Sequence, residues 1–257
     1  MTINNINNKA LGNTRYLPKG LLILHEDRDL LVIHKPEKLL SISTGRREGK
    51  HNRQKTAYSA LTDYVKKGAA KSRNRIFIVH RLDKDTSGVM LFAKNFKAKS
   101  FMQDNWDKTT KKYLAIVHGE LKEKERTLSS YLTENKELRV YATGNRNKGK
   151  LAQTKYKVIK ATKKYSLLDI ELITGRKNQI RVQMADAGHP VMGDRKYGRK
   201  KNHNDTKGNK TVNSRYMALH SYKLICIHPY NGKQMTFTSP PPPIFSSLPG
   251  LKIDLDF

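Results

Sequence analysis

Hydrophobic residues along the chain gather in short runs separated by polar turns, a pattern that is typical of β-strands. The stretch LLILHEDRDLLVIHKP, residues 21–36, predicts two strands around a charged turn at 26–29. Other runs are alternating or β-branched and predict further strands at 76–79, 89–93, 111–121, 136–143, 151–162, 165–174, 217–228 and 234–239. A chain with this many short strands is expected to build a sheet with antiparallel or mixed pairing.

Three segments have the spacing of helices instead. Apolar residues recur every four positions in 57–69, and 94–108 is a second candidate. The third is 177–188, where apolar residues share one face and Gly188 provides a C-terminal stop. Strands outnumber helices and do not alternate strictly with them. The prediction is an α+β fold on a mixed, largely antiparallel sheet flanked by helices and loops.

The domain organisation follows from the same pattern. Residues 1–20 are polar, rich in asparagine and without periodicity, and are expected to be a flexible arm. Residues 21–257 contain no repeat and no long linker, so they are expected to form a single domain. The lysine-rich stretch 195–211 is expected to be an inserted basic surface loop.

The charge of the chain points to a partner. Lysine and arginine number 51 against 22 aspartates and glutamates, a net charge of +29. Solubility alone requires a net charge of about 2–8, so a polyanionic partner is favoured over a solubilising surface or a general lysine bias. Phosphate contacts are expected from the basic segments 45–55, 66–75 and 195–210.

Several classes of protein are disfavoured. The only cysteine, Cys226, allows no disulfide within the chain and no cysteine-based zinc site. The nine histidines lack the spacing of a helical zinc motif, so no metal is expected. No run reaches the roughly 18 apolar residues of a membrane span, and the N-terminus lacks the apolar stretch of a signal peptide. A reduced, cytoplasmic protein is expected.

The segment VHRLDKDTSGVMLFAKN, residues 79–95, carries far more chemistry than a turn between two strands requires. Asp83 and Asp85 are two residues apart, and paired carboxylates occur in glycosidases. Asp85 precedes Thr86-Ser87-Gly88 and has the character of a turn-capping residue. Asp83 lies between cations, which favour the ionised form that a nucleophile needs.

A second polar segment is TGRKNQIRVQMADAGHPVMGD, residues 174–194. Within it Arg181 lies between Ile180 and Val182 on the predicted helix. Such an arginine either pairs with a carboxylate or extends its head to solvent along an apolar surface. The spacing favours neither reading.

Together these segments resemble one family. HRLDKDTSG is similar to the HRLDxxTSG signature of the RluA-type pseudouridine synthases, and further motifs follow in the family's order. The matching segments are LLILHEDRDLLVIHKP, KKYLAIVHGEL, GRKNQIRVQMADAGHPVMGDRKYG and ALHSYKLICIHPYNGKQMTFTSPPP. The resemblance covers about residues 21–245.

The resemblance implies an isomerase that converts uridine in RNA to pseudouridine without cofactor or metal. It implies that Asp83 is the nucleophile, that Tyr113 stacks on the target base, and that Arg181 pairs with the catalytic carboxylate. Arg81 would fill the space that a flipped-out base leaves in the stack. The remaining substrate-binding positions implied by the motifs are His80, Leu82, Thr86, Gly175, Arg176 and Gln179.

The chain departs from the family pattern at three positions. Lys38 stands where the family has a glycine, so a different backbone is expected after Pro36. Asn178 and Gln183 replace histidines and cannot titrate near neutral pH, which leaves a catalytic role for those histidines in doubt. No S4-type RNA-binding domain precedes residue 21, so substrate choice would rest on the catalytic domain.

Two alternatives stay open beside this reading. One is a catalytically silent RNA-binding protein of the same fold. The other is a glycosidic-bond enzyme that uses Asp83 and Asp85 as a carboxylate pair. The favoured reading is a monomeric enzyme acting on a stem-loop of ribosomal or transfer RNA.

Overall fold

The computed structural model describes residues 16–43, 55–67, 69, 71–198, 216–248 and 250. The chain divides into two compact units. Unit 1 comprises residues 1–111 and 221–240 with residue 257, and unit 2 comprises residues 112–220 and 241–256. The expected arm lies outside the described residues up to residue 15, as do residues 199–211 of the expected basic loop and most of the basic segment 45–55.

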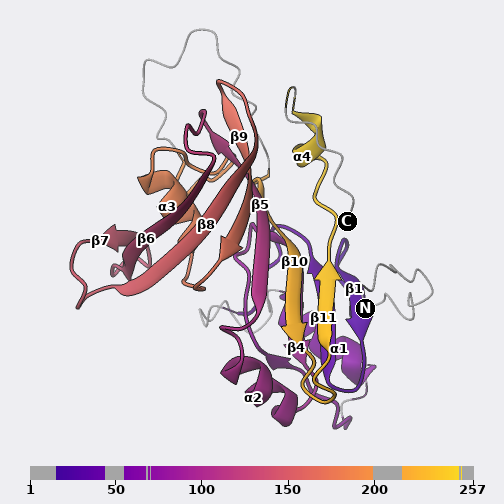
Figure 1. Cartoon of the computed structure of the whole chain (residues 1–257). Helices are drawn as coiled ribbons and strands as arrows, with labels where there is room; N and C mark the ends of the chain where they lie inside the picture. The colour runs from indigo at the N-terminus through magenta and orange to yellow at the C-terminus, as the bar shows by residue number, and fades with distance from the viewer. Residues whose placement is uncertain are drawn as a thin grey trace. The chain divides into compact units, whose positions relative to one another are not determined.

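Unit 1 is built on strands in the order β1-β2-β4-β10, and β3 pairs with β4. Strand β11 pairs with β10 and lies beside it in Figure 1. The bounds are β1 Leu22–Glu26, β2 Leu30–Lys35, β3 Phe77–Ile78, β4 Ser87–Ala93, β10 Leu219–Ile227 and β11 Gln234–Thr238. Its helices are α1 Ala57–Lys66 and α2 Phe96–Asp104, and α2 contacts β3 and β4. Pairing is antiparallel between β1 and β2, between β2 and β4, and between β10 and β11.

Unit 2 is built on antiparallel strands in the order β5-β9-β8-β6-β7 (Figure 1). The bounds are β5 Thr110–His118, β6 Glu125–Glu134, β7 Val140–Thr143, β8 Lys150–Ala161 and β9 Tyr165–Leu172. Its helices are α3 Gln179–Asp186 and α4 Ile244–Ser247. Helix α3 contacts β6, β7 and β8.

Local sequence sets the helix ends. Thr56 caps α1 in a capping box with Ser59, where the Ser59 amide donates to Thr56 Oγ1 at 3.0 Å. Asn95 caps α2 by accepting the Ala98 amide at 2.9 Å. Helix α3 ends where Gly188 takes a φ of +82°, with the Gly188 and His189 amides donating back to the last turn.

The core of unit 1 is formed around β4, whose seven residues are all buried. One face joins a cluster with Ala98 and Met102 of α2 and with Leu224 of β10. Burial of such side chains stabilises a fold by about 1.5–3 kcal/mol each. This core holds the strands that lead into and out of the polar segment around Asp83.

The α+β prediction with a mixed sheet is confirmed, and each predicted strand and helix has a counterpart in the structure. Strand β6 and helix α4 were not predicted. The sequence of β6, ERTLSSYLTE, lacks apolar alternation because nearly all its residues are exposed or half-buried. Its ladder with β8 runs from Glu125 to Leu132 and is formed by backbone hydrogen bonds, which carry no side-chain signature. No helix among the described residues is long and apolar enough to cross a membrane.

Candidate active site

The loop between β3 and β4, residues 79–86, carries the predicted nucleophile and is held through its backbone. The Ser41 hydroxyl donates to the Leu82 carbonyl at 2.7 Å and accepts the Leu82 amide at 3.2 Å. The Thr86 amide donates to the Asp83 carbonyl at 3.2 Å and closes a turn. Backbone anchors on both sides of Asp83 fix the path of the chain that carries its carboxylate.

His80 ties the same loop to β4. Its Nε2 accepts the Leu91 amide at 2.9 Å, and its ring stacks on Trp106 with centroids 4.5 Å apart. Burial, together with the nearby charge of Lys111, lowers the pKa of His80 to about 3. His80 is therefore neutral at physiological pH, as an acceptor of a backbone N–H must be. The contacts show His80 positioning the loop.

Exposure divides the residues of the signature. Arg81 and Asp85 are exposed, Asp83 is half-buried, and Leu82 and Thr86 are buried. An exposed Arg81 can reach an RNA ligand, whereas Leu82 and Thr86 help to anchor the loop. Gly88 has a φ of +116°, and a Cβ there would lie 2.1 Å from the Ser221 carbonyl oxygen. Only glycine lets β4 approach β10 this closely.

Lys35 was missed by the sequence analysis. It ends β2 with no exposed surface, and its Nζ donates to the carbonyls of Pro36 and Leu39 at 2.8 Å and of Lys84 at 3.2 Å. Burial lowers its pKa to about 7, although the charges of Asp85, Asp83 and Glu37 act to raise it. The available signal was a lysine at the end of an apolar strand directly before proline.

Lys38 has a φ of +61°, the left-handed conformation that favours glycine. Lys38 thus occupies a conformation that glycine adopts without strain. The expectation that the backbone after Pro36 differs from that of the family stays a prediction.

In unit 2 the side chain of Arg181 lies on α3 and is buried. Its Nε and Nη2 donate to the two carboxylate oxygens of Asp194 at 2.7 and 2.9 Å, a bidentate ion pair. The guanidinium also lies 5.2 Å from the centre of the Tyr197 ring. Of the two readings of this arginine, the structure supports the one with a carboxylate partner.

Asp194 was not singled out from the sequence. Burial acts to raise its pKa, but the hydrogen bonds and charge of Arg181 and the amides of Tyr197 and Lys196 hold the pKa below its ordinary value. Its Oδ1 also accepts the Lys196 amide at 2.8 Å and the Tyr197 amide at 3.0 Å. The pairing of Arg181 with Asp83 stays a prediction from the family resemblance.

The glutamines of α3 are structural in their contacts. Gln179 accepts the Thr174 hydroxyl at 2.8 Å and the Arg176 amide at 2.9 Å through Oε1, and donates to Thr154 Oγ1 at 2.9 Å. Gln183 accepts the Thr154 hydroxyl at 2.7 Å and donates to Ser130 and Ala152. An amide can both donate and accept here, so it fixes α3 on β6 and β8 without a titrating group.

Asn178 precedes α3 with a φ of +55°, and its Oδ1 accepts the Tyr197 hydroxyl at 3.2 Å. Gly175 and Arg176 line a pocket of about 370 Å³ together with Lys148, Lys150 and Lys177. Three lysines therefore line the pocket beside two of the predicted substrate-binding positions, together with Glu134, whose carboxylate pairs with Lys177.

Tyr113 lies on β5 opposite Ile170 of β9 and is 8% exposed. Asp83 belongs to unit 1, whereas Tyr113 and Arg181 belong to unit 2. That the three meet in one catalytic site stays a prediction from the family resemblance.

One group of potential metal ligands lies elsewhere in unit 1. Atoms of Asp27, Asp29 and His228 lie within 4.8 Å of one another. Asp27 Oδ2 is 2.7 Å from His25 Nε2 and 3.0 Å from His228 Nε2, and Oδ1 accepts the Asp29 and Leu30 amides. These bonds satisfy the carboxylate without an ion and explain the group as a capped turn.

Known proteins resemble this chain over most of its length. Residues 29–186 match the family model described as RNA pseudouridylate synthase. An uncharacterised RNA pseudouridine synthase of Mycoplasma genitalium is 33% identical over 230 residues, 88% of this chain and 68% of that protein. The ribosomal large subunit pseudouridine synthase D of Pasteurella multocida is 32% identical over 247 residues, 92% of this chain and 72% of that protein.

Solved structures show the same fold. Human RNA pseudouridylate synthase domain containing 4 superposes with a TM-score of 0.69 at 23% identity, covering 87% of this chain and 90% of that one. Human RNA pseudouridylate synthase domain containing 1 gives a TM-score of 0.64 at 25% identity, covering 90% of this chain and 86% of that one.

The protein is thus an isomerase with an α+β fold that acts on uridine in RNA. The chain belongs to the RNA pseudouridylate synthase family, in the RluA-type group that its motifs indicate.

Proposed function

We propose that this isomerase converts specific uridines of ribosomal or transfer RNA to pseudouridine, with Asp83 as the nucleophile on a flipped-out base. The observation that carries the proposal is the anchoring of the Asp83 loop by buried polar groups, Lys35 foremost. A relative named for the ribosomal large subunit supports ribosomal RNA as the first substrate to test.

In the proposed reaction the ionised Asp83 attacks the nucleotide, either at C6 of uracil or at C1′ of ribose. The N1–C1′ bond breaks, the base turns, and a C5–C1′ bond forms. C5 then loses a proton, N1 gains one, and the carboxylate is released. The reaction is therefore an isomerisation with no net gain or loss of atoms. Tyr113 would stack on the base and Arg181 would keep Asp83 ionised.

Access to the base requires extrusion from its stack, at a cost of a few kcal/mol. Arg81 is suited to fill the vacated space, because it is exposed in the structure and its guanidinium is planar. The net charge of +29 supplies the electrostatic attraction for the RNA backbone.

The test is pseudouridine mapping of ribosomal and transfer RNA from a deletion strain and from strains rescued with wild type, Asp83→Ala or Asp85→Ala. The proposal expects a site that is lost on deletion, restored by wild type and by Asp85→Ala, and not restored by Asp83→Ala. Equal loss with both aspartate variants would instead support a carboxylate pair. No change at any uridine, with RNA binding intact, would favour the silent RNA-binding alternative.

A further inference from the structure

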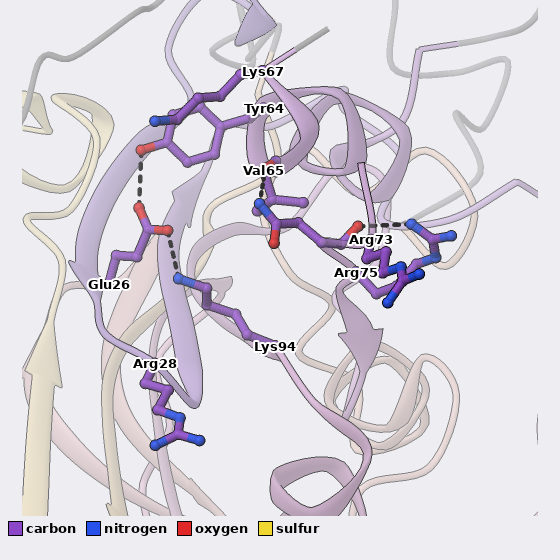
Figure 2. A pocket seen from close by; sticks show the side chains of 9 residues that line it. Glu26, Arg28, Tyr64, Val65, Lys67, Arg73, Arg75 and Lys94 are labelled. Carbon is purple, nitrogen blue, oxygen red and sulfur yellow. Dashed lines mark hydrogen bonds and ion pairs between the residues drawn. The ribbon is translucent and has the colours of Figure 1, made fainter. Parts of the chain in front are cut away.

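Unit 1 contains a pocket lined mainly by cationic side chains, here called the basic pocket. It has a volume of about 740 Å³ and lies between the β1–β2 turn, the end of α1, segment 73–75 and the residue after β4 (Figure 2). Its charged lining residues are Glu26, Arg28, Lys67, Arg73, Arg75 and Lys94. Five cations against one carboxylate leave a formal charge of +4.

The single carboxylate is already engaged. Lys94 Nζ donates to Glu26 Oε1 at 2.7 Å, and the Tyr64 hydroxyl donates to Oε2 at 2.9 Å, a chain of contacts visible on one side of Figure 2. Burial and the Glu26 carboxylate raise the pKa of Tyr64 to about 12, so the tyrosine stays a donor. Glu26 therefore compensates Lys94 and leaves the other four cations uncompensated.

Those four cations have little else to bind. Within the described part of the chain, the side chains of Arg28, Lys67 and Arg73 show no hydrogen bond or ion pair. Arg75 donates only to the Ser72 and Asn74 carbonyls, at 2.8 and 3.0 Å. Like charges gathered in a concave surface repel one another, and a bound polyanion relieves that repulsion.

The end of α1 does not account for the charges. Helix carbonyls attract cations, but Asn74 Nδ2 already donates to the Val65 carbonyl at 2.9 Å. The backbone amide of Lys67 bonds to the carbonyls of Asp63 and Tyr64. Arg28, moreover, lies on the turn between β1 and β2, away from the helix in sequence.

The basic pocket lies far from the Asp83 loop within the same unit. Strands β2 and β4 pair with Leu30 opposite Ala93 at one end and Lys35 opposite Gly88 at the other. Lys94 follows the first end, and the Asp83 loop precedes the second. Six residue steps from Gly88 to Lys94, at about 3.3 Å each, separate the two places by about 20 Å, so one nucleotide cannot occupy both.

An exposed aromatic residue is tethered to the same turn. Tyr230, 83% exposed, lies in the β10–β11 turn two residues after His228. His228 Nε2 is 3.0 Å from Asp27 Oδ2, and Lys94 Nζ donates to the Asp27 carbonyl at 2.6 Å. Asp27 thus links the β10–β11 turn and the pocket cation Lys94 to the turn that carries Arg28. Aromatic rings among cations are typical of surfaces on which unpaired bases stack.

We propose that the basic pocket is a second RNA-binding site, which holds backbone phosphates of the substrate RNA about 20 Å from the target uridine. The inference rests on the proposed function in that it takes the substrate RNA as the ligand. A free nucleotide or inorganic phosphate shares the chemistry but cannot also engage the catalytic loop. The site selects RNA long enough to span both places.

The test compares two triple variants that remove the same charge. The pocket variant, Arg28→Gln/Lys67→Gln/Arg73→Gln, removes three positive charges from the basic pocket. The control variant, Lys122→Gln/Lys124→Gln/Lys163→Gln, removes three exposed lysines of unit 2. Binding of a large-subunit ribosomal RNA transcript is measured from 50 to 300 mM salt in an Asp83→Ala background. The pocket variant is expected to bind about tenfold more weakly at 150 mM salt and to lose about 2 units of the log–log salt slope, at roughly 0.7 per phosphate contact. The control is expected to retain the wild-type slope.

Activity gives the second readout. With Asp83 present, the pocket variant is expected to have a higher KM than wild type for the long RNA. A stem-loop too short to span about 20 Å is expected to be modified equally well by the pocket variant and by wild type. Identical salt slopes for pocket and control variants would overturn the proposal. The proposal would also be overturned if the pocket variant bound RNA as tightly as wild type and millimolar inorganic phosphate abolished RNA binding by wild type. A wild type that forms no pseudouridine would refute the proposed function but leave the binding comparison valid.

Discussion

The Nζ of Lys35, a side chain with no exposed surface, donates a hydrogen bond to the carbonyl of Lys84, the residue after the proposed nucleophile. The same ammonium group binds the carbonyls of Pro36 and Leu39. One buried amino group therefore connects the end of β2 with the loop that carries Asp83, and in its protonated form, below its pKa of about 7, it places positive charge near that carboxylate. This arrangement makes Lys35 a positioning residue whose effect can be measured separately from the chemistry.

Lys35→Met should keep the volume of the side chain but remove the donor to three carbonyls. Unsatisfied buried acceptors cost about 1–3 kcal/mol each, so we expect a clear loss in the free energy of urea unfolding and a lower kcat. A variant with wild-type stability and wild-type kcat would show that the three hydrogen bonds have no positioning role.

The pH dependence of the same variant is a separate test. The pKa of Lys35 is lowered to about 7 in the folded state from 10.5, so the unfolded state binds more protons between these values. Stability contributed by this group is therefore lowest below pH 7 and rises with pH towards 10.5. The difference in unfolding free energy between wild type and Lys35→Met should widen in favour of wild type across that window. A difference that stays constant with pH would contradict the lowered pKa.

Asp194→Ala should leave the buried Arg181 without its bidentate partner. Breaking one side of a buried ion pair costs about 3–5 kcal/mol, and we expect a loss of that size in urea unfolding together with lower kcat. Asp186→Ala, an exposed carboxylate on the same helix, serves as the control and should change stability by no more than about 0.5 kcal/mol. Equal stability of the two variants would show that the pair is not required.

Gly88→Ala should be among the most damaging single changes in unit 1. The new Cβ would lie 2.1 Å from the Ser221 carbonyl oxygen, at a φ of +116°. Strain of about 1–3 kcal/mol for the backbone adds to the clash, so we expect at least about 2 kcal/mol lost in thermal or urea unfolding. Gly144→Ala, where the Cβ meets nothing within 4 Å, is the matched control. A mild effect at Gly88 would mean that β4 and β10 can separate at this point.

Lys38→Gly should be neutral or stabilising, which is unusual for a glycine substitution. A φ of +61° costs a side-chain-bearing residue roughly 1–2 kcal/mol, against roughly 0.5–1 kcal/mol for the greater freedom of glycine in the unfolded chain. We expect a gain of up to about 1 kcal/mol, measured by urea unfolding. Lys122→Gly, at an exposed position without positive φ, should lose stability instead. A loss at residue 38 would show that the lysine side chain makes a stabilising contact.

The sequence by itself determined the family, the fold class and nearly all the strands and helices. Apolar runs such as VMLFA and capping residues such as Thr56 and Asn95 act over a few neighbours, so their effect is readable without the fold. The motif around Asp83 was equally local, because its residues follow one another along a single loop. Strand β6 could not be predicted, because its pairing partners on β7 and β8 come later in the chain and use backbone groups that every residue possesses.

Only the tertiary structure decided which polar residues pair. The bond from Lys35 to Lys84 joins residues 49 apart, and His228 meets Asp27 across 201 residues. The basic pocket likewise collects cations from four separate segments. The reason is physical. The strength of a hydrogen bond or ion pair depends on distance in space, and the sequence does not show whether a lysine side chain ends in solvent or, like Lys35, is buried beneath the loop that carries Asp83. Folding alone brings these groups together and sets their pKa values.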